Sequence, residues 1–266
     1  MGPVLVDYHM HLRTSGGATE ALDHSVEAVV RYVEQALERG VDEIGITEHV
    51  YYFRETRDCW TLPYQLDRCR AELGPYCDAV LEAKRRGLPV KLGLEVDWVP
   101  ECADELAAVL EPFPWDYLIG SVHWIGGLAV DQQPGLWAGG SVRDVWALYA
   151  RELEAAARSG HFDVLAHPDL VKIFGDRVDW DWQPVIDALD GVALEVSTAG
   201  LHKPVGELYP DAALLRGASR ITLASDAHVA ENVGRDFEAA VAHARAAGFE
   251  TVTVFDGRSS RQEPLG

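Results

Sequence analysis

The chain has 266 residues and carries 23 Lys and Arg against 43 Asp and Glu, which gives a formal net charge of −20 at pH 7. This charge argues against a duplex nucleic-acid partner, because neutralising phosphates requires a basic face. Hydrophobic residues make up 48% of the chain, so it can bury a sizeable core, and intrinsic disorder is excluded.

No membrane or secretion segment is visible in the sequence. The first eleven residues lack a charged stretch followed by an apolar one, and no run of about 18 apolar residues occurs. The four cysteines, Cys59, Cys69, Cys77 and Cys102, form no CxxC pair. We therefore expect a cytoplasmic protein with reduced thiols.

Short apolar runs alternate with amphipathic segments, as in a parallel sheet or barrel. Seven runs are predicted to be strands: 4–9, 43–49, 90–98, 117–124, 163–168, 192–198 and 221–228. Helices are predicted over 25–40 and near 64–86, 101–110, 143–158 and 235–247. Residues 251–255 could add a last strand, and 256–266 are expected to be a frayed tail behind a single domain over 1–255.

Six of the seven predicted strands end in a histidine or an acid. Strand C-termini are where the active sites of α/β barrels are built. The residues at these ends are His9, His11, His49, Glu95, His123, His167, Asp226 and His228. The sixth strand carries Glu195 and lacks an obvious ligand. Any one of these histidines alone would more often be structural, but eight groups at one end of a sheet indicate a shared site.

Imidazole and carboxylate are ligands of Zn, Mn and Fe, so this set predicts a metal centre. A single zinc site needs only three or four ligands, and eight groups therefore imply more than one metal ion. The two oxygens of Glu95 could bridge two of them. Paired metals can share a hydroxide nucleophile and stabilise charge on a phosphoryl group, so hydrolysis of a phosphoester or an amide is expected.

Seven motifs occur in order at these strand ends. They are DYHMH (7–11), TEH (47–49), GLEVD (93–97), GSVHW (120–124), AHPDLVK (166–172), EVSTAGLHKPVGELYP (195–210) and SDAH (225–228). The set resembles the PHP (polymerase and histidinol phosphatase) family, and most of all its histidinol-phosphatase branch. The resemblance covers nearly the whole chain, from residue 4 to about residue 245.

The resemblance implies a distorted seven-stranded β/α barrel with a trinuclear metal centre. Its first metal would be held by His9, His11, Glu95 and Asp226, and its second by Glu95 with His123 and His167. The third would use His49 and His228 with a histidine shortly after HxH. The sequence departs from the family here, because the next histidine is His24, which we assign to the third site after a short insertion.

The resemblance also implies a small phosphomonoester as substrate, histidinol phosphate above all. Asp226 or His228 would protonate the leaving alkoxide. Basic groups near the ligands are candidates for phosphate binding, because a phosphomonoester is an anion. The substrate-binding candidates are Arg13, Arg54, Lys172, His202 and Lys203. Relatives carry an arginine after STAGL, where this chain has His202 and Lys203.

Three alternatives stay open at this stage. A nuclease of the same superfamily would need a basic track for a strand, which the net charge disfavours. A non-catalytic, regulatory metal-binding barrel would have no need of a nearly complete ligand set. An amidohydrolase would need a carboxylated lysine as bridging ligand, and neither Lys91 nor Lys172 lies where one is expected.

Overall fold

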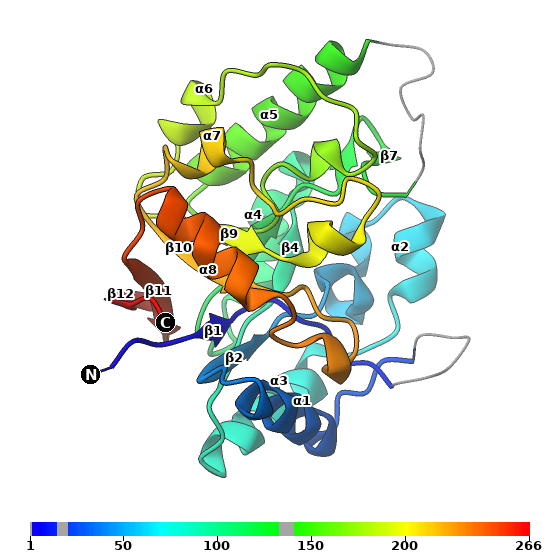
Figure 1. The fold of residues 1–266 in the computed structure, drawn as a ribbon. Coiled ribbons are helices and arrows are strands. Elements are labelled where there is room, and N and C mark those ends of the chain that lie inside the picture. The colour runs from blue at the N-terminus through cyan, green and yellow to red at the C-terminus, as the bar shows by residue number, and fades with distance from the viewer. Residues whose placement is uncertain (1, 15–20, 133–140) are drawn as a thin grey trace.

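The computed structural model describes residues 2–14, 21–132 and 141–266, with strands and helices alternating along the chain (Figure 1). The strands are β1 (Val6–Asp7), β2 (Glu43–Ile46), β3 (Val90–Leu92), β4 (Glu95–Asp97), β5 (Ile119–Ser121), β6 (Trp124–Ile125), β7 (Leu128–Ala129), β8 (Val164–Leu165), β9 (Ala193–Ser197), β10 (Ile221–Ala224), β11 (Thr251–Asp256) and β12 (Ser259–Pro264). Each of the seven predicted runs contains a parallel strand, and the run 90–98 contains two.

Helices occupy most of the connections between these strands. The α-helices are α1 (Val26–Glu38), α2 (Pro63–Arg68), α3 (Leu73–Arg85), α4 (Ala103–Leu110), α5 (Val142–Arg158), α6 (Gln183–Ile186), α7 (Ala212–Leu215) and α8 (Phe237–Ala246). The 3-10 helices are η1 (Val50–Tyr52), η2 (Arg54–Cys59), η3 (Pro100–Cys102), η4 (Leu170–Lys172), η5 (Ala199–His202) and η6 (Ala230–Asn232). The predicted helix 64–86 is divided into α2 and α3.

Helix α1 shows how the sequence places a helix against the strands. The hydroxyl of Ser25 accepts a hydrogen bond from the backbone N–H of Ala28, which caps the helix N-terminus. The buried residues, Ala28, Val29, Tyr32, Val33 and Ala36, recur every three to four positions on one face, whereas the acidic residues and Leu37 are exposed. Figure 1 shows α1 beside α3 at one end of the molecule, and α8 across β9 and β10.

The parallel strands form two sheets, one of three strands in the order β1-β2-β3 and one of five in the order β10-β9-β8-β5-β4. The expected α/β class with a parallel sheet is therefore confirmed. Two residues join β3 to β4 across one boundary between the sheets. At the other boundary the backbone N–H of Tyr8 donates to Leu223 O (3.0 Å) and that of His11 donates to Ala227 O (2.8 Å). A single closed barrel of seven strands stays a prediction.

The side chain of Tyr117 lies between the two sheets and is fully buried. It precedes β5 of the larger sheet, yet its hydroxyl donates to the backbone oxygen of Tyr8 beside β1 (2.7 Å). Its ring stacks on Phe255 with centroids 5.1 Å apart. Gly45 of β2 leaves room for this ring, since a Cβ there would lie 1.8 Å from the Tyr117 hydroxyl oxygen. The two sheets therefore share one core.

The C-terminal tail is not frayed, and this expectation was wrong. Strand β12 pairs antiparallel with β11 from Ser259 to Pro264. The tail looked frayed because the side chains of β12 are mostly exposed and polar, so no alternation of hydrophobic residues marks the strand. Gly257 and Arg258 both have positive φ, as a two-residue hairpin turn after Asp256 requires, and the glycine at the first turn position was the available signal.

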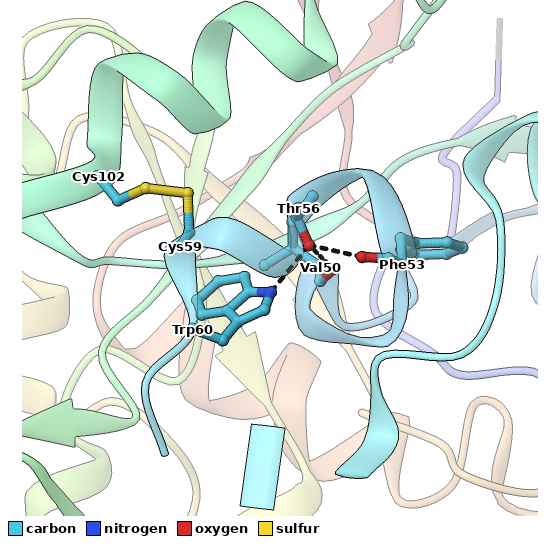
Figure 2. The surroundings of a disulfide bond; sticks show 6 residues. All are labelled: Val50, Phe53, Thr56, Cys59, Trp60 and Cys102. Carbon is cyan, nitrogen blue, oxygen red and sulfur yellow. Dashed lines mark hydrogen bonds between the residues drawn. A yellow bond between two sulfur atoms is a disulfide. The ribbon is translucent and has the colours of Figure 1, made fainter. Parts of the chain in front are cut away.

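The expectation that all four cysteines are reduced was also wrong. Cys59 at the end of η2 and Cys102 at the end of η3 form a disulfide, shown in Figure 2, whereas Cys69 and Cys77 are free and buried. The two bonded cysteines are 43 positions apart, and only the fold brings η2 next to η3. The hydroxyl of Thr56 stabilises the same segment by bonding backbone oxygens of η1 and its C-cap and by accepting from the Trp60 indole.

None of the helices within the described residues is long and apolar enough to cross a bilayer.

The close approach of Tyr117 to β2 predicts the effect of a small substitution. Gly45→Ala should lower the free energy of unfolding by about 1–3 kcal/mol, because the new methyl group overlaps the Tyr117 ring. Gly74→Ala in α3 is the matched control, since a Cβ there meets no atom of the described residues within 4 Å, and it should leave the free energy of unfolding unchanged or slightly raised. Urea unfolding of both variants checks this, and equal stabilities would contradict it.

The disulfide predicts a second effect on stability. The Cys59→Ala/Cys102→Ala double variant should lose about 2–4 kcal/mol of unfolding free energy, because the unfolded chain is no longer closed into a loop. Urea unfolding with and without reductant measures this. Reductant should lower the unfolding free energy of the wild type to that of the double variant, and it should leave the unfolding free energy of the double variant unchanged. If the urea midpoint of the wild type is the same with and without reductant, the disulfide is absent.

Candidate metal centre

The candidate ligands lie where the parallel strands end, and they come from both sheets. His9 and His11 follow β1, His49 follows β2, and His123 follows β5. In the same way His167 follows β8, and Asp226 and His228 follow β10. Glu95 is the first residue of β4, separated from the end of β3 by two residues, and is therefore located at the boundary between the sheets. Eight side chains predicted from sequence thus converge on one place.

Glu95 is the centre of this cluster and is fully buried. Its Oε2 lies 2.6 Å from His49 Nδ1, 3.4 Å from His9 Nε2 and 3.6 Å from His11 Nε2. Its Oε1 lies 3.2 Å from His167 Nε2 and 3.4 Å from His123 Nε2. The two oxygens thus face different sets of histidines, which is the arrangement that a bridging carboxylate needs.

Asp226 closes the opposite side of the cluster. Its Oδ1 lies 3.3 Å from His11 Nε2, 3.7 Å from His9 Nε2 and 3.6 Å from His228 Nδ1. Four groups of three potential ligands occur among the described residues, and within each group the ligand atoms all lie within 4.8 Å of one another. The groups are His9, His11 and Asp226; His9, Glu95 and His167; His11, His49 and His228; and His49, Asp97 and His123.

Several inward-facing atoms of the cluster have no aligned hydrogen bond within the described part of the chain. They include Nε2 of His9, Nε2 of His11, Nδ1 of His49 and Oε2 of Glu95, all of them buried. Buried polar atoms are costly without a partner. A group of such atoms pointing at one another fits divalent cations, and imidazole with carboxylate is a donor set suited to Zn, Mn or Fe.

The charges of the cluster depend strongly on one another. Burial alone would raise the pKa of Glu95, but His49, His9 and His123 outweigh it and hold that pKa well below its usual value. Asp226 behaves in the same way beside His9 and His11. Burial would lower the pKa of His123, yet Glu95 and Asp97 raise it to about 10. Both carboxylates are therefore anionic at neutral pH and ready to accept cations.

Burial lowers the pKa of His49 and of His228, and the charge of neighbouring groups only partly offsets it. These two imidazoles are therefore neutral at pH 7, the form in which a histidine binds a metal.

Three buried carboxylates outside the predicted set contact the outer nitrogens of the histidines. Asp97 lies 2.9 Å from His123 Nδ1 and also accepts from the Trp124 indole. Glu48 lies 3.6 Å from His11 Nδ1. Glu195 lies 2.7 Å from His9 Nδ1. These three residues were not among the predicted ligands, although Glu48 and Asp97 occur within the TEH and GLEVD motifs and Glu195 opens the motif EVSTAGLHKPVGELYP.

His24 does not join the cluster. Its Nε2 lies 3.3 Å from Glu48 Oε1, and its ring packs against Phe53 and Tyr76. Of the four ligand groups found among the described residues, none contains His24, and the group with His49 and His228 contains His11 instead. The third site with His24 stays a prediction that this placement does not favour.

A small pocket of about 150 Å³ opens onto the cluster. Its lining combines histidines, aromatic rings and three other polar side chains: Arg13, His49, Tyr51, Tyr52, Tyr64, His123, Trp124, Asp131, Gln132 and His228. Arg13 is nearly fully buried, and its guanidinium donates to the Tyr52 hydroxyl (2.6 Å). Among the five predicted substrate-binding residues, Arg13 is the one that lines this pocket.

The other four predicted substrate-binding residues lie elsewhere. Lys172 is fully buried and pairs with Asp169 and Asp211, each at 2.7 Å. Arg54 is exposed and pairs with Glu72. Exposed His202 contacts Asp236 at 2.6 Å, and Lys203 is exposed at the end of η5. The local sequence could not reveal that the ammonium group of Lys172 pairs with buried carboxylates inside the protein.

The model of the PHP domain family matches residues 7–199. The chain belongs to the PHP family. A relative from Deinococcus radiodurans with the name "Probable histidinol-phosphatase" is 37% identical over 266 residues, spanning 94% of this chain and 96% of its own. The histidinol-phosphatase of Lactococcus lactis is 24% identical over 272 residues, spanning 95% of this chain and 94% of its own. The predicted family and branch are confirmed.

A solved structure with the same PHP fold supports the architecture. The crystal structure of the Lactococcus lactis histidinol phosphate phosphatase, complexed with zinc, L-histidinol and phosphate, superposes with a TM-score of 0.73. It covers 98% of this chain and 100% of its own, at 20% identity. At this identity the likeness shows the fold.

The placement of His24 predicts a difference between two histidine variants. His24→Ala should bind as many metal ions as the wild type, because His24 faces Glu48 rather than the cluster. His228→Ala should bind fewer, because His228 belongs to a ligand group. Elemental analysis after reconstitution with Zn or Mn gives the counts. Loss of an ion in His24→Ala would restore His24 as a ligand of the third site.

Proposed function

We propose that this protein is a metal-dependent phosphatase that hydrolyses a small phosphomonoester, L-histidinol phosphate, to L-histidinol and phosphate. The observation that carries the proposal is the bridging arrangement of Glu95, whose two oxygens face different groups of histidines beside a small pocket. The proposal is supported by the relative at 37% identity and by the zinc, L-histidinol and phosphate of the Lactococcus lactis structure.

We propose two to three divalent ions, Zn, Mn or Fe, at this centre. The first would be held by His9, His11, Glu95 and Asp226, and the second by Glu95, His123 and His167. A third would use His49 and His228, with His11 nearer to them than His24 is. Such ions, when bound, supply Lewis acidity that lowers the pKa of water and neutralises phosphoryl oxygens.

Side chains of the protein would bind the phosphoryl group and transfer the proton. The guanidinium of Arg13, held by Tyr52, would bind a phosphoryl oxygen at the pocket. Water adds to phosphorus while the bond from phosphorus to the alkoxide breaks, and the alkoxide takes up a proton. We assign to His228 or Asp226 the transfer of the proton that the attacking water loses: the group accepts this proton in its basic form and then passes it to the alkoxide. His228 is the more exposed of the two and lines the pocket.

We also propose that the two sheets are parts of one distorted seven-stranded barrel, with the metal site at the C-terminal ends of its strands. The backbone hydrogen bonds between β1 and β10 and the position of Tyr117 between the sheets support this. A barrel accounts for the convergence of ligands from six strand ends.

A phosphate-release assay tests the function. The protein is reconstituted with Zn, Mn or Fe(II) and offered histidinol phosphate, other small phosphomonoesters and a single-stranded oligonucleotide. We expect the highest kcat/KM with histidinol phosphate, loss of activity on chelation and recovery when metal is returned. Cleavage of the oligonucleotide alone, or activity that survives chelation, would contradict the proposal.

A pair of variants controls this assay. Glu95→Ala should lose two ions together and nearly all activity, because one carboxylate serves both. Asp163→Asn is the matched control, since Asp163 is a largely buried carboxylate that bonds Leu118 N and Arg258 away from the cluster. It should keep its metal content and its activity.

A further inference from the structure

Glu195 is the ionisable residue of β9, and the proposed function assigns it no role. Strand β9 lies between β8 and β10 in the five-stranded sheet, and all five of its residues are buried. A fully buried carboxylate requires partners, because burial without them is costly. Both of its oxygens have a partner among the described residues, and both partners are metal-facing histidines.

The first partner is the ring of His9. Glu195 Oε2 lies 2.7 Å from His9 Nδ1, on the side of the ring away from the cluster. A carboxylate accepts hydrogen bonds, so Nδ1 carries the hydrogen and the lone pair is left on Nε2. That nitrogen lies 3.4 Å from Glu95 Oε2 and 3.7 Å from Asp226 Oδ1. Glu195 thus fixes both the tautomer and the direction of His9.

The second partner is the backbone of His167. Glu195 Oε1 accepts a hydrogen bond from the His167 N–H at 3.1 Å. His167 has φ of 26°, a left-handed conformation that is unfavourable for a residue with a Cβ and persists only where the surroundings hold it. This conformation places His167 Nε2 3.2 Å from Glu95 Oε1. Glu195 therefore also helps to hold the second histidine.

We propose that Glu195 is a positioning residue that sets the spacing of two metal subsites, since one carboxylate holds His9 on the Oε2 side of Glu95 and His167 on its Oε1 side. The proposal rests on the metal centre of the proposed function. Asp97 contacts the ring of His123, and Glu48 contacts His11 and His24, of which His24 belongs to none of the ligand groups among the described residues. Carboxylates behind metal-bound histidines orient the ring and raise metal affinity.

The Glu195→Gln variant isolates this role because it keeps the size of the side chain. An amide has one accepting oxygen, whereas Glu195 accepts from two N–H groups on its two oxygens. The amide nitrogen must then face a second donor, so either His9 or His167 loses its support. We expect the dissociation constant for Zn²⁺ or Mn²⁺ to rise tenfold to a hundredfold. Excess metal should restore most of the kcat.

The test is a titration of the metal-free protein with Zn²⁺ or Mn²⁺ against a competing chelator dye, together with thermal unfolding of the metal-free form. Weaker binding with an unchanged unfolding midpoint supports the proposal. Binding as tight as in the wild type overturns it. An equal loss of metal affinity in the control Asp163→Asn also overturns the proposal, because the loss would then come from removing any buried carboxylate and not from the contacts of Glu195.

A second variant keeps the test decisive if Glu195→Gln does not fold. Glu195→Asp retains the carboxylate but is one methylene shorter, so it cannot reach both His9 and His167. The same loss of affinity is expected, and wild-type affinity would overturn the proposal. Since the titration contains no substrate, a wild type that binds metal without releasing phosphate would refute the proposed function alone.

Discussion

The structure depends on one buried charge, the carboxylate of Glu95. A buried carboxylate is tolerated only when surrounding groups compensate it, and here five histidines from four strand ends do so. Their convergence requires strands of both sheets to end at the same place. The break between β3 and β4 serves this requirement, because it places Glu95 at the boundary of the two sheets rather than inside one of them.

The surroundings of this charge are fixed by groups that do not face the pocket. Three outer carboxylates, Asp97, Glu48 and Glu195, contact the rings of His123, His11 and His9. On the pocket side, Arg13 is held by Tyr52 of η1, and the disulfide at the end of η2 ties the following segment to η3. Rigid supports of this kind reduce the reorganisation that catalysis would otherwise require.

Much of the site could be predicted from sequence, because its residues follow short apolar runs that parallel strands require. The positions of His9, His123 and His167 follow from this pattern alone, and the two oxygens of Glu95 face different histidines, while its bridging role stays a prediction. The pattern does not predict ion pairs between residues that are far apart in the sequence. Lys172 looked like a phosphate ligand, yet it neutralises Asp169 and Asp211, the latter 39 positions away.

The sequence by itself determined the α/β class, the PHP family and the eight residues of the candidate metal centre, since these depend on local periodicity and on motif order. Only the tertiary structure decided the division into two sheets, the Cys59–Cys102 bond, the β11–β12 hairpin, the place of His24 and the partners of Glu195. Each of these depends on which distant segments meet, and a buried carboxylate shows its function only once its two neighbours are known.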